Sequence, residues 1–123
     1  MSVRAVLVCV AAALALLLAP APALAGNGCG PSGFGSVVPD RPLGFDFSAA
    51  CATHDACYGA PWRERAPSHA MAKADCDTTF LSDLDLVCVT GGRRVDRCLG
   101  LAREYYRAVR TWLGDLAYAA AQL

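Results

Sequence analysis

Residues 51–58 read Cys-Ala-Thr-His-Asp-Ala-Cys-Tyr, and this stretch decides the fold that we expect. It lies in a predicted helix over residues 48–58. At about 100° per residue, five positions fall within about 60° of His54, namely Phe47, Ala50, Cys51, Cys57 and Tyr58. His54 is therefore predicted to face the protein interior, and Asp55 to point to the flank. A lone histidine on such a face is more often a core residue than a catalytic one, so a second feature has to support a catalytic role.

That feature is an acidic residue in the next predicted helix, which covers residues 68–89 with Ser68 as its N-cap. One line along this helix is apolar except for Asp77. The line consists of Ala70, Ala74, Asp77, Leu81, Leu84 and Cys88. A carboxylate within a buried stripe is costly unless it is paired. We therefore expect Asp77 to contact the imidazole of His54.

The short connection between these two helices supports the pairing, because it predicts that they run antiparallel. If Cys57 bridges Cys76, moving back one turn from Cys57 brings His54 opposite Asp77. A carboxylate bonded to one imidazole nitrogen leaves the other nitrogen free to accept a proton. The sequence offers no evident serine or cysteine nucleophile, so water is the expected nucleophile.

A third, C-terminal helix is predicted from about Asp96 to Leu113, on apolar positions spaced three or four residues apart. Those positions are Cys98, Ala102, Tyr105, Val109, Trp112 and Leu116. No stretch alternates with period two for long enough to form a convincing core strand. The prediction is a small all-α fold with two antiparallel core helices, and residues 115–123 carry no clear signal.

The N-terminal residues 1–25 have the pattern of a secretory signal peptide, with Arg4, an apolar run and a small-x-small site ending at Ala25. The run of about 15 residues is short for a spanning helix, which needs about 20, although a membrane anchor is the alternative. We expect an extracellular, secreted protein with a single domain over residues 26–123.

Six cysteines remain in this domain, and an even number in a small exported chain predicts disulfide bonds. They are Cys29, Cys51, Cys57, Cys76, Cys88 and Cys98. Zinc is the alternative use of Cys and His, but the domain has no CxxC or HxxxH pair. Six cysteines allow fifteen pairings, and the sequence does not choose among them.

Residues 26–42 are rich in Gly and Pro and predict a loop whose backbone groups can converge. Together with the flanking carboxylate of Asp55, carbonyl oxygens of this loop can provide the hard ligands that Ca²⁺ prefers. A bridge from Cys29 to Cys51 would hold the loop beside Asp55. A cation there would act on the electrophile that a water activated by His54 attacks.

On these residues the sequence resembles the secreted phospholipase A2 family. The CxxHDxCY signature of that family is intact at residues 51–58, and its Cys-Asp pair is present as Cys76-Asp77. Residues 27–35 resemble a short form of the family's calcium loop, with Ser32 where a glycine is expected. The resemblance implies a phospholipase A2-like fold and calcium-dependent hydrolysis of the sn-2 ester of glycerophospholipids.

The resemblance also implies a role for each matching residue. His54 would be the general base, Asp77 would orient its imidazole, and Tyr58 would support Asp77. Asp55 would be the side-chain ligand of Ca²⁺. The implied carbonyl ligands are those of Gly28, Gly30 and Ser32. The implied disulfides are Cys29–Cys51, Cys57–Cys76 and Cys88–Cys98.

The expected partner is a phospholipid at a membrane or micelle surface, and the protein is expected to be a monomer. Eleven basic and eleven acidic side chains cancel, so no basic field points to nucleic acid. The alternative function is a non-catalytic secreted binding module, or a toxin-like one, on the same scaffold, because fold does not dictate activity. The presence of both His54 and Asp55 favours the enzyme. A third hypothesis is a structural role in which calcium only staples the loop.

Overall fold

The computed structural model describes residues 29–30 and 38–123 of the 123-residue chain. These residues form four α-helices, two short 3₁₀ segments and no strand. The helices are α2 (Ser48–Gly59), α3 (His69–Gly91), α4 (Val95–Val109) and α5 (Trp112–Ala121), and the 3₁₀ segments are η1 (Pro42–Gly44) and η2 (Trp62–Glu64). The predicted all-α fold is confirmed. The predicted signal peptide and most of the glycine-rich loop lie outside the described residues.

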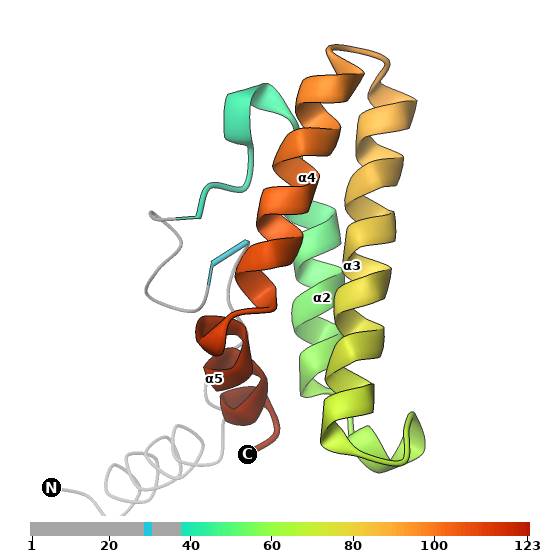
Figure 1. Ribbon diagram of the computed structural model, residues 1–123, viewed down its shortest axis with the longest axis vertical. Coiled ribbons are helices and arrows are strands. Elements are labelled where there is room, and N and C mark those ends of the chain that lie inside the picture. Colours follow the sequence, from blue (N-terminus) through green and yellow to red (C-terminus); the bar gives the residue numbers. More distant parts are fainter. Residues whose placement is uncertain (1–28, 31–37) are drawn as a thin grey trace, which may run out of the picture.

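The helices form one compact bundle in which α3 is the longest member. Figure 1 shows α4 running alongside α3 in the opposite direction, with α2 behind them and α5 at the lower end of α4. The main core fills the space between α2, α3 and α4 and the segment before α2. It consists of Phe45, Phe47, Ala50, Cys51, Phe80, Leu84, Cys88, Cys98 and Ala102. None of the described helices has both the length and the apolar character needed to cross a bilayer.

The helix ends follow from local sequence. Ser68 caps α3, because its side chain accepts a hydrogen bond from the backbone N–H of Met71. Gly92 ends the same helix in the left-handed conformation, at φ 65°, which glycine adopts without strain. At the start of α2 the carboxylate of Asp46 accepts from the backbone N–H of Ser48 at 3.1 Å. Asp46, which precedes the N-cap residue Phe47, therefore provides the polar group at this helix end.

Three disulfides tie the helices and the loop together, with the pairing that the resemblance implied. Cys29–Cys51 joins the loop to α2, Cys57–Cys76 joins α2 to α3, and Cys88–Cys98 joins α3 to α4. Their Cα atoms lie 4.8, 5.7 and 5.4 Å apart, within the range for disulfides. Each bridge typically contributes about 2–4 kcal/mol in a domain of this size.

The predicted end of the third helix, near Leu113, is wrong. Helix α4 ends at Val109, and a separate helix, α5, begins at Trp112. Thr111 is extended at the break, with ψ 176°. Gly114 makes the reversal possible, since a Cβ atom at this position would lie 1.8 Å from the carbonyl oxygen of Val109. Trp112 and Leu116, predicted to continue the buried stripe, are instead 69% and 60% exposed.

The buried line of α3 also differs from the predicted one in its first half. Ala70 and Ala74 are exposed, and the fully buried positions are Ala72, Cys76, Asp77, Phe80, Leu84 and Cys88. The reason is that α3 packs on both α2 and α4, so its buried face follows the four-residue series that contains two disulfide cysteines. Asp77 lies at the edge of that face and has no solvent exposure.

Candidate active site

The centre of the site is a contact between α2 and α3. His54 Nε2 lies 2.8 Å from Asp77 Oδ1, and both side chains are buried, with 5% and 1% exposure. The Cys57–Cys76 bridge, one turn from His54 and next to Asp77, holds the two helices in this register. An ionised carboxylate can only accept hydrogen bonds, so Nε2 carries the hydrogen and Nδ1 keeps its lone pair.

Two further donors complete the hydrogen bonding of Asp77. The hydroxyl of Tyr58 donates to Oδ1 at 2.6 Å, and the ammonium of Lys73 donates to Oδ2 at 2.8 Å. Burial alone would raise the pKa of Asp77, but the hydrogen bonds from His54, Lys73 and Tyr58 outweigh burial and hold it below its ordinary value. Asp77 is therefore a carboxylate that the protein itself keeps ionised.

Aromatic rings fix the plane of the His54 imidazole. The Phe80 ring stacks on it with centroids 4.4 Å apart and an interplanar angle of 28°. The Tyr58 ring lies against it at 4.1 Å and 51°. These contacts leave the ring little freedom to turn, so Nδ1 is held in one direction.

Asp55, the next residue along α2, has the opposite surroundings. Its Oδ2 atom is buried and has no hydrogen-bond partner within the described part of the chain. Burial, with a contribution from the negative charge of Asp40, raises the pKa of Asp55 to about 7. A buried carboxylate oxygen with no donor, near a second acidic side chain, fits the coordination of a hard cation such as Ca²⁺.

The other predicted ligands are only partly visible. Gly30 is buried next to the Cys29–Cys51 bridge, whereas Gly28 and Ser32 lie outside the described residues. Among residues 29–30 and 38–123, no group of three or more His, Cys, Asp or Glu side chains is arranged to bind a metal. Any cation at Asp55 would therefore need backbone carbonyl oxygens, as the glycine-rich loop predicts.

The loop is anchored by a residue that the sequence did not single out. Asp40 Oδ1 accepts a hydrogen bond of 2.7 Å from the backbone N–H of Cys29, and its own carbonyl accepts one of 2.9 Å from Phe47. Asp40 thus links the residue beside Gly30 to the start of α2. Its position eleven residues after a loop cysteine gives no local signal of this contact.

Helix α5 supports the same centre from the other side, although residues 115–123 carried no clear signal in the sequence. The Tyr118 ring packs edge-on against Tyr58 with centroids 5.3 Å apart, and the Tyr118 hydroxyl lies 3.1 Å from His69 Nδ1. Gln122 Nε2 donates to the carbonyl oxygens of Tyr58 and Ala60 at 2.5 and 2.9 Å. These contacts hold Tyr58, and through it Asp77.

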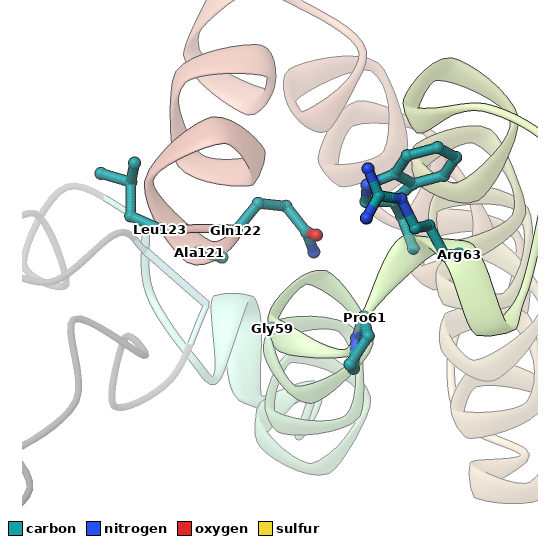
Figure 2. A pocket seen from close by; sticks show the side chains of 7 residues that line it. Gly59, Pro61, Arg63, Ala121, Gln122 and Leu123 are labelled. Carbon is teal, nitrogen blue, oxygen red and sulfur yellow. The ribbon is translucent and has the colours of Figure 1, made fainter.

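A surface hollow of about 320 Å³ lies between the end of α5 and the turn that follows α2, and it is not lined by His54, Asp55 or Asp77. Figure 2 shows the side chain of Gln122 reaching from the end of α5 over the turn at Gly59 and Pro61. The hollow contains neither His54 nor Asp77, so we do not regard it as the active site.

Comparison with known proteins gives one result. A family model described as prokaryotic phospholipase A2 matches residues 25–113. The match contains His54, Asp55, Asp77 and all six bridged cysteines, and it ends at the second residue of α5. No curated protein and no solved structure shows a significant match to the chain.

Proposed function

Because the chain belongs to the prokaryotic phospholipase A2 family, we propose that it hydrolyses the sn-2 ester bond of glycerophospholipids and requires Ca²⁺ to do so. The products are a fatty acid and a lysophospholipid. The observation that carries the proposal is the buried His54–Asp77 pair, in which the imidazole is fixed by a fully hydrogen-bonded carboxylate.

The proposed reaction uses His54 as a general base. Nδ1 takes a proton from water while the water oxygen attacks the ester carbonyl carbon. Asp77 stabilises the imidazolium that forms, through the hydrogen bond to Nε2. When the tetrahedral intermediate collapses, the same nitrogen returns the proton to the departing glycerol oxygen. The base is then neutral again and ready for another cycle.

Asp55 and the Gly30 carbonyl, with the carbonyls of Gly28 and Ser32, would hold the cation. The buried Oδ2 of Asp55, for which the described residues provide no donor, supports this assignment. When bound, Ca²⁺ would supply positive charge that stabilises the negative charge developing on the ester oxygen.

The proposed partner is an aggregated phospholipid surface, on which the protein acts as a monomer after export. Trp112, Leu113 and Leu116 are 69%, 51% and 60% exposed on the outer face of α5. They are preceded by two exposed arginines, Arg107 in the last turn of α4 and Arg110 at its C-cap. Apolar side chains next to arginines are typical of helices that lie on a lipid interface. The three disulfides support an oxidising, extracellular location.

A positional hydrolysis assay tests the proposal. Phosphatidylcholine vesicles labelled separately in the sn-1 and sn-2 chains are incubated with the mature protein in Ca²⁺ or in EDTA. We expect release of the sn-2 label only, in Ca²⁺ only. His54→Gln protein is the control for contaminating lipase. Full activity in EDTA would exclude the metal requirement, and no release under any condition would favour a non-catalytic module.

A further inference from the structure

The only lysine of the chain lies against Asp77. The sequence contains eleven basic Lys and Arg residues, and ten of them are arginine. Lys73, the exception, precedes Asp77 by one helical turn, and its side chain is only 12% exposed. Long cationic side chains are rarely buried unless they are paired, so this burial requires specific acceptors.

The acceptors come from three helices. Lys73 Nζ lies 2.8 Å from Asp77 Oδ2 on α3 and 2.7 Å from the carbonyl oxygen of Val109, the last residue of α4. It also lies 3.5 Å from Asp115 Oδ1 on α5, a side chain that is 70% exposed. The Tyr58 ring on α2 is 5.7 Å away. The compact ammonium group thus donates hydrogen bonds to Asp77 and to the Val109 carbonyl, and it forms an ion pair with Asp115.

This arrangement divides the two oxygens of Asp77 between different donors. Oδ1 accepts hydrogen bonds from His54 and Tyr58, and Oδ2 accepts one from Lys73. A carboxylate held at only one oxygen can turn about its terminal torsion, which is broad and soft. A carboxylate held at both oxygens cannot turn without breaking a buried ionic hydrogen bond.

We propose that Lys73 is a positioning residue of the active site, whose ammonium holds the Asp77 carboxylate so that Oδ1 stays on His54. This role rests on the proposed function and deepens it. Lys73 does not contact His54, and it acts on the reaction through Asp77 alone. The lysine thereby connects the end of α4 and the start of α5 to the catalytic base.

The competing interpretation is a structural clamp, in which Lys73 only joins α3 to α4 and α5 and the contact with Asp77 is incidental. Both interpretations accept the contact with Asp77, and they differ in what they predict for turnover. A clamp predicts loss of stability with normal turnover in the protein that stays folded. A positioning residue predicts lower kcat with little change in KM.

The first experiment needs no activity. In mature protein labelled with ¹⁵N at the lysine Nζ, Lys73 gives the only side-chain ammonium resonance. We expect a resonance protected from exchange in the wild type, and a shifted or exchange-broadened one in Asp77→Asn. A fast-exchanging resonance that is identical in the two proteins would overturn the proposal.

The second experiment measures kcat and KM on a monomeric short-chain phospholipid. We expect Lys73→Met to lower kcat by at least about tenfold with KM within about twofold of the wild type. Lys73→Arg, which keeps a cation at this position, should recover part of the loss. Asp115→Asn is the matched control, because it removes only the exposed partner of Lys73, and its kcat should stay within about twofold.

Unchanged kcat in folded Lys73→Met protein would overturn the proposal in favour of the clamp. If Lys73→Met does not fold, the kcat of Lys73→Arg decides, because a clamp predicts the wild-type value and a positioning residue predicts a lowered one. The two experiments also distinguish failure of the proposed function from failure of the proposed role of Lys73. A wild-type protein without hydrolytic activity would end the proposed function, whereas the resonance would still report whether Lys73 is bound to Asp77.

Discussion

The two carboxylates of the site, Asp77 and Asp55, differ in what the protein provides for them. Asp77 is fully buried, receives hydrogen bonds from His54, Tyr58 and Lys73, and has a lowered pKa. Asp55 has a buried oxygen without a donor in the described residues, and burial raises its pKa to about 7. One carboxylate is complete within the protein, and the other is suited to an external cation.

This difference separates the site into two halves. The half around Asp77 is preorganised by side chains on α2, α3 and α5, so its geometry should not depend on the calcium concentration. The half around Asp55 stores an unfavourable interaction that a bound cation would relieve. Substitutions in the two halves should therefore have different effects on turnover, stability and calcium binding.

The largest effect is expected from the base itself. His54→Gln removes the nitrogen that we propose accepts the proton, and we expect kcat to fall by about 10³-fold, within the range for a general base. Calcium binding should remain, because Asp55 is unchanged. Two measurements check the two halves. Turnover of sn-2 labelled phospholipid tests the Asp77 half, and calcium affinity measured by calorimetry tests the Asp55 half. If kcat stayed within tenfold of the wild type, water activation by His54 would be ruled out.

The comparison becomes sharper when each carboxylate is neutralised in turn. Asp77→Asn leaves the ammonium of Lys73 without its buried counterion, and we expect the free energy of unfolding to fall by about 3 kcal/mol. Asp55→Asn should leave stability in EDTA unchanged or higher, because it removes a charge whose buried oxygen has no hydrogen-bond donor among residues 29–30 and 38–123.

Thermal melts of both variants in EDTA and in Ca²⁺ provide the measurement. The wild type and Asp77→Asn should both be stabilised by Ca²⁺, and Asp55→Asn should not. A calcium-dependent shift that survives in Asp55→Asn would remove Asp55 from the proposed ligands.

A smaller effect is expected at the junction that supports the Asp77 half. Gly114→Ala places a methyl group 1.8 Å from the Val109 carbonyl, the oxygen that also accepts from Lys73. We expect α5 to be displaced, a loss of about 2 kcal/mol and a lower kcat. Gly100→Ala is the control, because no atom lies within 4 Å of the added methyl, and stability should be unchanged or increase. Equal melting temperatures in the two variants would contradict the close packing of α5.

The smallest expected effect is the pH dependence of stability without calcium, because Asp55 is partly exposed and solvent screens its charge. The pKa of Asp55 in the folded protein is about 7, above the value of about 3.9 in an unfolded chain. The folded state therefore binds more protons between these values, and Asp55 lowers stability as pH rises from about 4 to about 7.

Asp77 has the opposite sign, since its lowered pKa contributes stability above about pH 4 that is lost in stronger acid. Melting temperatures in EDTA should decline by a few degrees from pH 4 to pH 7 in the wild type and stay nearly flat in Asp55→Asn. An equal decline in both proteins would assign it to another group.

The Asp77 half was predicted well from the sequence because its signal is local. The position of His54 on the inner face of α2 follows from helical spacing, and an acidic residue in an apolar helix face points to a buried partner. The single lysine one turn before Asp77 was visible too, but at the surface such a pair is an ordinary helical contact. Only the burial of Lys73 distinguishes it.

The rest of the support depends on long-range packing that the local pattern does not contain. The apolar spacing continues through Trp112 and Leu116, and the break between α4 and α5 arises because Gly114 can approach the end of α4. The contacts of Tyr118 and Gln122 with Tyr58 follow from that break. In α3, alanines at the first two positions of the predicted line count as apolar but are too small to decide which face is buried.

The central claim is that the His54–Asp77 pair and the Asp55 carboxylate form one site, completed by a cation. A crystal structure of the mature protein grown with Ca²⁺, using anomalous scattering to locate the ion, tests it most directly. We predict an ion bound to Asp55 Oδ2 and to loop carbonyl oxygens, on the Nδ1 side of His54, with Nε2 still on Asp77. An ion bound elsewhere, with Asp55 turned into solvent, would contradict the account.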